Sequence, residues 1–304
     1  PQIVHESEAA YEEDVATAAH LIAERRHELR MVIISGPSSS GKTTTTIKVE
    51  QRLKKAGLKF ATLNVDNYFF DLALHPKDEF GDYDFETPQA LDIPLINEHL
   101  HRLTLGEEVL IPHYDFKSST RYLDRTPMRL APDEILLIDS LHGLYPTMTQ
   151  DIEDEQQFQL YIETLLQMED MSGRMIRWTD LRLMRRMVRD ASFRAYDPRG
   201  TLEHWHYVRS SEMRNIIPYA NTTDYIINGA LSYELPVMRR RLLEEFAQWA
   251  QDYEGDALRV DAHKRAQRLH KLLQSIAPIG AEDEQAIPAN SHFREFIGGS
   301  QYEY

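Results

Sequence analysis

Residues 36–43 read Gly36-Pro-Ser-Ser-Ser-Gly-Lys-Thr43, which matches the pattern G-x-x-x-x-G-K-[ST]. The glycines of this pattern let the backbone curl until successive N–H groups point at phosphate oxygens. Lys42 can reach the β- and γ-phosphates, and the Thr43 hydroxyl can bind Mg²⁺. The stretch predicts a site for a nucleoside triphosphate, ATP, with Mg²⁺ rather than a Ser/Gly-rich linker. We expect it to consist of Gly36, Pro37, Ser38, Ser39, Ser40, Gly41, Lys42, Thr43 and Thr44.

The segments around this loop predict an α/β fold. The apolar run 31–35 before it is typical of a buried parallel strand, and 43–56 after it has the pattern of a helix, so the loop meets a helix N-terminus that favours anions. Further strands are expected at 59–65, 135–138, 158–163 and 224–228, and helices at 8–30, 87–103, 179–194, 201–215, 235–253 and 261–276. This alternation indicates a parallel sheet with helices on both faces, as in P-loop NTPases.

Three parts of the chain are expected. They are an N-terminal helical segment (1–29), a P-loop domain (30–253) and a helical C-terminal extension with a tail (254–304). The middle part holds a β-hairpin insertion at about 104–130, with short β segments at 108–116 and 129–130. Residues 67–88 are rich in Asp, Phe, Tyr and Pro and suggest a functional excursion, and 277–291 are predicted to be a loop.

Composition limits the partners. The 304 residues are 42% hydrophobic and carry a net charge of −15, so nucleic-acid binding is disfavoured. Without cysteines, disulfides and thiolate metal sites are excluded. No apolar run approaches 18 residues and no signal peptide is visible, so we expect a cytoplasmic protein with no membrane partner. Because the chain starts at Pro1, we expect a trimmed N-terminus or a fragment.

Two acidic residues follow predicted strands. In this architecture ligands bind at the carboxyl ends of strands. Asp66 there could accept a proton from a substrate hydroxyl or help to hold Mg²⁺, although a turn aspartate remains the alternative. Asp139 ends an Ile-Leu-Leu-Ile run, the usual pattern of a Mg²⁺-supporting aspartate, with a helix N-cap as the alternative.

Arginines cluster between 182 and 189 on an otherwise acidic chain. Arg182 and Arg185 are one helical turn apart and so lie on the same side of the predicted helix. A pair of guanidiniums there could stabilise a transferring phosphoryl group. The alternative is a solvated helix face.

With these residues in view, the chain resembles the phosphoribulokinase/uridine kinase family of P-loop kinases. The resemblance spans about 30–250 and rests on the loop and four further segments: Asp66-Asn-Tyr-Phe, Tyr83 to Asp92, Pro112 to Phe116 with Arg121, and Arg182 to Asp190. It implies that Asp66 is the base on the accepting hydroxyl, that the second segment binds ribose, that the third is a hairpin closing over the base, and that the fourth is a lid helix. The substrate site would then contain Tyr83, Phe85, Glu86, Tyr114, Ser119 and Arg121.

The chain is most similar to a bacterial branch of uridine kinase-like proteins that carry a TGS domain. It shares that branch's loop, the strand end Asp139-Ser-Leu-His-Gly-Leu144 and the tail Phe296-Ile-Gly-Gly-Ser300. No TGS domain precedes residue 30, so we expect it to be trimmed or absent. The resemblance also implies a dimer or tetramer.

The chain departs from typical members at three positions, with Ser119 in place of a hairpin histidine, Phe69 in place of a tyrosine and Glu86 in place of an aspartate. We expect phosphorylation of a primary hydroxyl, the 5′-hydroxyl of uridine or cytidine, with recognition resting more on the vicinal diol than on the base. A kinase of a sugar phosphate or polyol, and a non-catalytic nucleotide-binding regulatory module, are the alternatives.

Overall fold

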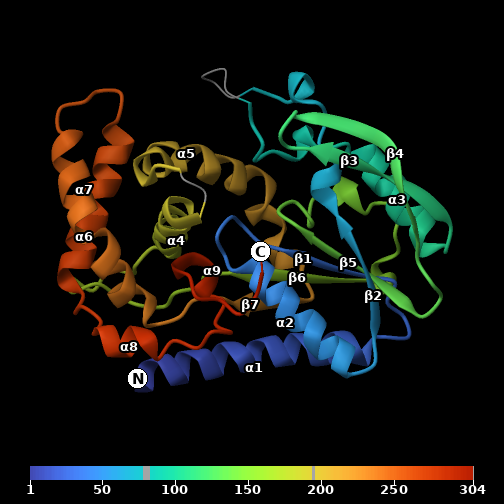
Figure 1. Cartoon of the computed structure of the whole chain (residues 1–304), viewed down its shortest axis with the longest axis horizontal. Coiled ribbons are helices and arrows are strands. Elements are labelled where there is room, and N and C mark those ends of the chain that lie inside the picture. The colour runs from blue at the N-terminus through green and yellow to red at the C-terminus, as the bar shows by residue number, and fades with distance from the viewer. Residues whose placement is uncertain (78–82, 194–195, 304) are drawn as a thin grey trace.

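In the computed structural model of the chain, a five-stranded parallel sheet forms the centre, with strand order β2-β5-β1-β6-β7 (Figure 1). The structure describes residues 1–77, 83–193 and 196–303, so part of the expected excursion at 67–88 and the end of the expected helix at 179–194 lie outside it. The strands are β1 (Met31–Ser35), β2 (Lys59–Asn64), β5 (Glu134–Ser140), β6 (Gln157–Glu163) and β7 (Tyr225–Asn228). Every neighbouring pair in this sheet is parallel, which confirms the predicted fold class.

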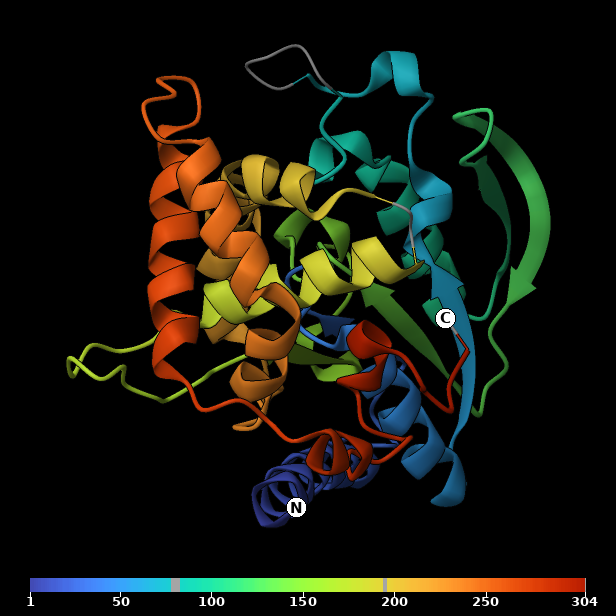
Figure 2. The ribbon, with the colours of Figure 1, turned by 60° about the vertical axis from the view of Figure 1, so that its left-hand side comes forward.

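Helices cover both faces of the sheet. Alternate residues of β1 point to opposite faces, so the strand contributes to two separate apolar clusters. Val32 and Ile34 belong to one apolar cluster, and Met31 and Ile33 belong to another. The first cluster packs helices α1, α2 and α4 to α7, and the second packs α3 (Figure 2). The longer helices are α1 (Gln2–Glu24), α2 (Lys42–Lys55), α3 (Ile93–Thr104), α4 (Trp178–Phe193), α5 (Pro198–Asn215), α6 (Glu234–Asp252) and α7 (Val260–Ser275). Among the described residues, we find none of the helices long and apolar enough to cross a membrane.

The expected insertion is a full two-stranded hairpin, formed by β3 (Glu108–Asp115) and β4 (Thr120–Arg129). The second β segment was predicted at 129–130 only, and this prediction was wrong in extent. Strand β4 covers ten residues and ends at Arg129. Most β4 side chains are exposed, so this strand carries no alternating apolar pattern that a sequence reading could find.

The starts of α3 and α1 differ most from the prediction. Helix α3 begins at Ile93 and not at Thr87, because the Asp92 side chain accepts a hydrogen bond from the Leu95 N–H at 3.2 Å and caps it there. Residues Pro88–Ala90 form a separate 3₁₀ turn. Helix α1 begins at Gln2 and ends at Glu24, well before the predicted end at residue 30.

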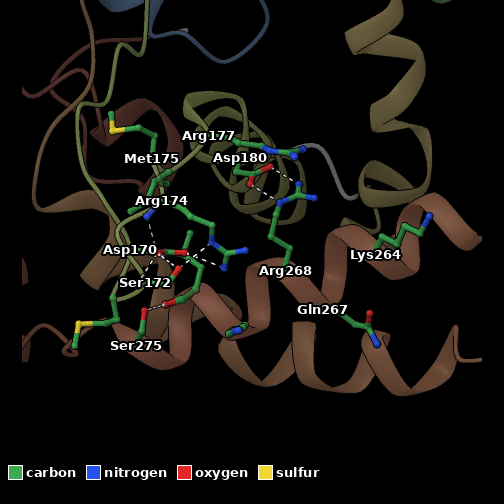
Figure 3. Close-up of a pocket in the computed structure, with 14 residues that line it drawn as sticks. Asp170, Ser172, Arg174, Met175, Arg177, Asp180, Lys264, Gln267, Arg268 and Ser275 are labelled. Atoms are coloured by element: carbon green, nitrogen blue, oxygen red, sulfur yellow. Dashed lines mark hydrogen bonds and ion pairs between the residues drawn. The ribbon is translucent and has the colours of Figure 1, made fainter.

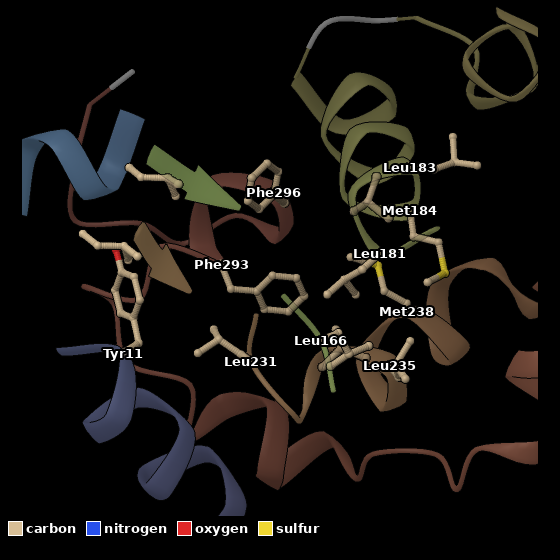
Figure 4. Close-up of a cluster of buried hydrophobic side chains, with 14 of the residues drawn as sticks. Tyr11, Leu166, Leu181, Leu183, Met184, Leu231, Leu235, Met238, Phe293 and Phe296 are labelled. Carbon is tan, nitrogen blue, oxygen red and sulfur yellow. The ribbon is translucent and has the colours of Figure 1, made fainter. Parts of the chain in front are cut away.

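The C-terminal part packs back onto the rest of the molecule. Helices α6 and α7 lie side by side, and the expected loop 277–291 contains the short helix α8 (Ala281–Gln285). Beyond it, Phe293 and Phe296 are fully buried and join the same apolar cluster as Tyr11 of α1 and Leu181 of α4 (Figure 4). Phe296 belongs to α9 (Arg294–Ile297). The division into three parts stays a prediction, and the three parts share this core.

Candidate active site

The phosphate loop curls between β1 and α2 against the neighbouring strand β6. A Cβ on Gly36 would lie 2.4 Å from the Ile162 carbonyl oxygen, so a larger residue does not fit there. Gly41 takes a φ of +93° at the start of α2, a conformation that favours glycine. Both glycines of the motif are therefore required by the backbone path.

The loop presents hydrogen-bond donors that suit an anion. The hydroxyl groups of Ser39 and Ser40 are buried, and neither bonds to a described residue. In the first turn of α2, the Thr44 hydroxyl donates to the Glu295 carboxylate at 3.0 Å. Unpaired buried donors and a helix start that already holds a carboxylate fit the phosphates of a nucleotide.

Lys42, Asp66 and Asp139 come together at the carboxyl ends of the strands. The register of the sheet sets Asp139 opposite Ile34 of β1 and Asn64 of β2. The Lys42 ammonium forms an ion pair with the Asp139 carboxylate. Asp66 follows within the 3₁₀ turn Val65–Tyr68, where the Asn64 side chain accepts a hydrogen bond from the Asp66 N–H at 2.9 Å. Sequence positions 42, 66 and 139 thus meet at one edge of the sheet.

The electrostatics of this cluster act on Asp66. Desolvation by the surrounding protein raises the pKa of the Asp66 carboxyl, the nearby Lys42 lowers it, and the negative Asp139 raises it; the net direction is upward. A carboxyl with a raised pKa is a stronger base than an ordinary aspartate.

A Mg²⁺ ion here would need the nucleotide as a co-ligand. In the part of the chain that the structure describes, three or more His, Asp or Glu side chains never gather closely enough to hold a metal by themselves. The Thr43 hydroxyl and the Asp139 carboxylate are the groups available beside phosphate oxygens, and Mg²⁺ is often held by one or two protein groups and phosphates. The donor set fits this arrangement.

Arg182 and Arg185 lie on the carbonyl side of the phosphate loop and are fully buried. Arg182 donates to the Ser38 carbonyl at 3.0 Å, and Arg185 to the Ser40 carbonyl at 3.0 Å. Because the loop's N–H groups are the ones that would face phosphate, both guanidiniums contact the opposite side of its backbone. Their assignment as a clamp on the transferred group stays a prediction.

Buried carboxylates balance both arginines. Glu212 accepts two hydrogen bonds from Arg182, at 2.6 and 2.8 Å, and Glu163 lies 2.9 Å from the same guanidinium. Glu234 accepts two from Arg185, both at 2.6 Å. Burial lowers the pKa of Arg182, but the two carboxylates outweigh it and raise the pKa, so the guanidinium stays charged. These pairs join helix α4 to β6, α5 and α6.

The neighbouring Arg186 lies one helical turn after Arg182 on α4 and is about a quarter exposed, at 24%. It donates to the Ser38 hydroxyl at 3.3 Å and to the Glu86 carboxylate at 3.1 Å. It therefore connects helix α4, the phosphate loop and the expected ribose-binding segment.

The expected acceptor residues gather around an aromatic cluster beside Asp66. Phe69 packs against Phe85 with ring centroids 5.8 Å apart, and against Tyr114 with centroids 5.6 Å apart. The hairpin is fixed there because the Tyr114 N–H donates to the Asn67 side chain at 3.2 Å. The excursion after β2 and the hairpin β3–β4 thus form one surface next to the candidate base.

The other predicted acceptor residues occupy its edges. Arg121 pairs with Asp92 at 2.7 Å, while Ser119 lies in the hairpin turn with a φ of 53°. Tyr83 is exposed and its ring lies 4.8 Å from the Lys77 ammonium. Of the predicted acceptor residues, Phe85 and Tyr114 pack directly on Phe69, three positions after Asp66.

A family model confirms the resemblance. It is described as the phosphoribulokinase/uridine kinase family and matches residues 31–233, two thirds of the chain. The chain belongs to this family. As a member, it is a kinase, and the family implies that it uses ATP; Mg²⁺ is typical of the family.

Curated relatives of this family member are named uridine kinases. The protein from Deinococcus deserti is 26% identical over 64% of this chain and 84% of its own length. The Bacillus pumilus protein is 28% identical over 64% and 83%. A solved D-glycerate 3-kinase from Cryptococcus neoformans aligns over 85% of this chain and 87% of its own, with 12% identity and a TM-score of 0.36.

Three histidines in or near the site of this kinase were not predicted. His75 is buried beside Phe85, with ring centroids 4.7 Å apart; its Nε2–H donates to the Phe70 carbonyl at 2.7 Å, and its buried Nδ1 contacts no described hydrogen-bonding group. His142 is buried, which lowers its pKa to about 4. His292 packs against Gly41. The aromatic-rich composition around 67–88 was the signal that could have pointed to His75.

A cavity of about 680 Å³ lies away from the phosphate loop, between the segment 170–177 and helix α7 (Figure 3). Arg268 of α7 holds Asp180 on its wall through two hydrogen bonds, at 2.7 and 2.9 Å. The residues that line it include none from the loop or the aromatic cluster, so this cavity is separate from the candidate active site.

Proposed function

We propose that this kinase transfers the γ-phosphoryl group of ATP to the 5′-hydroxyl of uridine or cytidine. The observation that carries the proposal is the position of Asp66, whose carboxyl feels the charges of the Lys42–Asp139 pair and which precedes Phe69 of the aromatic cluster by three residues. A base at this point can contact an acceptor hydroxyl on one side and the terminal phosphate on the other.

In the proposed reaction, Asp66 accepts the proton of the acceptor hydroxyl. The oxygen then forms a bond to the γ-phosphorus, the bond from that phosphorus to the bridging oxygen breaks, and ADP leaves. Lys42 moves from Asp139 to the phosphate oxygens, which frees the Asp139 carboxylate to support Mg²⁺ beside Thr43. Mg²⁺ supplies charge neutralisation of the β- and γ-phosphates.

Arg186 is the arginine of helix α4 that we assign to the transferred group. It is partly exposed and already contacts the Ser38 hydroxyl and the Glu86 carboxylate. When ATP and the acceptor bind, a guanidinium in this position can exchange these contacts for an oxygen of the phosphoryl group. Arg182 and Arg185 then serve to position the loop backbone.

The acceptor side supports a pyrimidine nucleoside through two kinds of group. Phe85 and Tyr114 offer flat apolar surface for a base, and Glu86 can accept hydrogen bonds from the vicinal diol of ribose. Since Nε2–H of His75 donates to a carbonyl, its Nδ1 is a hydrogen-bond acceptor. Both uracil, through N3–H, and cytosine, through its amino group, can donate to such an acceptor.

The test is release of ADP from ATP across uridine, cytidine, 2′-deoxyuridine, adenosine, glycerate and a sugar phosphate. We expect turnover with the first two at similar rates and much poorer turnover with the deoxynucleoside. Asp66→Asn should lower kcat about a hundredfold or more while ATP still binds. Asp133→Asn, at a surface ion pair with Lys59, is the control and should leave kcat unchanged.

Turnover with glycerate or the sugar phosphate alone would keep the kinase and refute the nucleoside assignment. Binding of ATP without turnover of any acceptor would favour a regulatory nucleotide-binding module instead.

A further inference from the structure

The C-terminal tail reaches the phosphate loop, although the family match ends at residue 233. Residues 291–297 run between α1, α4 and the start of α2, and α4 and α9 are in contact. His292 packs against the loop itself, because a Cβ on Gly41 would lie 2.7 Å from its ring. The same ring donates to the Gly229 carbonyl at 2.9 Å. A segment far away in sequence thus becomes part of the loop's surroundings.

One side chain of this tail contacts the loop as an anion would. The Glu295 carboxylate accepts a hydrogen bond from the Thr44 hydroxyl at 3.0 Å. Burial raises the pKa of Glu295, whereas Arg189, the hydroxyl and backbone N–H of Thr44, and Lys42 all lower it; the net direction is upward. Donors from the first turn of the loop helix, together with the loop lysine, are the groups that hold phosphates in this kind of loop.

Two neighbours keep Glu295 in place without fixing its side chain. Phe293 and Phe296 are fully buried and anchor the chain on either side. A rotation of the Glu295 side chain would therefore free Thr44 while the tail stays attached. Because the carboxylate is less stable there than in water, a nucleotide phosphate with more negative charge can displace it.

We propose that Glu295 is an intramolecular competitor of the nucleotide, with a carboxylate that occupies an anion position of the phosphate loop until a phosphate group displaces it. This inference rests on the proposed function, since it takes the loop to be the nucleotide site. A competitor tethered to the same chain acts at a high effective concentration. The apparent affinity for the nucleotide is then the intrinsic affinity multiplied by the fraction of molecules in which the anion position is free. Nucleotide affinity is thereby set in part by a residue outside the phosphate loop.

The test measures binding of Mg·ADP by calorimetry to the full chain, without an acceptor. Glu295→Gln removes the charge and keeps the shape, so we expect the dissociation constant to fall about tenfold, as when nine molecules in ten hold the competing contact. Glu295→Asp withdraws the carboxylate by one methylene group and should give an intermediate value. Glu303→Gln, at an exposed residue of the same tail, is the matched control and should bind like the wild type.

The outcomes separate this inference from the proposed function. If the wild type binds Mg·ADP through Lys42 but Glu295→Gln binds equally or more weakly, the inference is overturned and the nucleotide site stands. If the wild type, Lys42→Ala and Glu295→Gln all fail to bind, the nucleotide site itself is refuted and the inference falls with it. Should Glu295→Gln not fold, Glu295→Asp decides, and unchanged or weaker binding by that variant overturns the inference.

Discussion

The phosphate side and the acceptor side of this kinase are built in different ways. Behind the phosphate loop, two fully buried arginines are balanced by buried carboxylates and hold backbone carbonyls in place. On the acceptor side, Phe85 and Phe116 remain exposed on an excursion and a hairpin that meet through aromatic rings. The residues behind the phosphate loop thus form a rigid, buried frame, whereas the proposed acceptor site is a partly exposed surface where substitutions cost little stability.

The largest effect is expected on stability, at the buried arginines behind the phosphate loop. Arg185→Ala leaves Glu234 buried and unpaired, and removing one partner of such a pair costs about 3–5 kcal/mol. Urea unfolding should show this loss in the free energy of unfolding. Arg174→Ala, at an exposed ion pair with Asp170, is the control and should lose no more than about 1 kcal/mol. Equal stability of the two variants would contradict a stabilising role for the buried Arg185–Glu234 pair.

The next effect concerns catalysis on the phosphate side. Lys42→Ala should lower kcat about a hundredfold or more, because charge on the phosphate oxygens loses its compensation. Lys54→Ala, an exposed residue of the same helix that pairs with Glu50, should behave like the wild type. A near-normal kcat for Lys42→Ala would show that catalysis occurs elsewhere.

A pH effect on kcat/KM is expected from Asp66. Asp66 must be unprotonated to accept a proton, and its pKa is raised, so kcat/KM should decline at a higher pH than it would for an ordinary aspartate. Below that pKa the decline should be about tenfold per pH unit. The acid limb should disappear from the residual activity of Asp66→Asn, and a limb that persists would assign it to another group.

The smallest effect is expected on the acceptor side. His75→Ala removes one hydrogen-bond acceptor, which is worth about 1 kcal/mol, so kcat/KM for uridine and for cytidine should each fall about fivefold to tenfold. The exposed His113 of the hairpin provides the control, His113→Ala, which should leave both values unchanged. A loss confined to ATP affinity would remove His75 from the acceptor site.

The sequence indicated that Lys42, Asp66 and Asp139 meet at one edge of the sheet, because the loop is contiguous and the two aspartates lie at the ends of strands. It identified Arg182 and Arg185 as a pair. Helical spacing does not reveal that these arginines form buried ion pairs with Glu212 and Glu234, which lie far along the chain. The acceptor side was predicted less completely: β4 lacks an apolar pattern, and His75 joins Phe85 only through the path of an irregular segment. Glu295 had no local signal at all, since its partner Thr44 lies 251 positions away.

Helix α1 limits where the chain can be truncated. Its Tyr11 hydroxyl lies 2.7 Å from the Thr45 hydroxyl, and its Glu12 carboxylate pairs with Lys48 and Arg52 of α2. The family model begins only at residue 31, after this helix. A fragment that starts there would contain every motif and yet expose the core face that Val15 and Ile22 cover. The segment that matches the family model is therefore shorter than the segment that packs one common core in this chain.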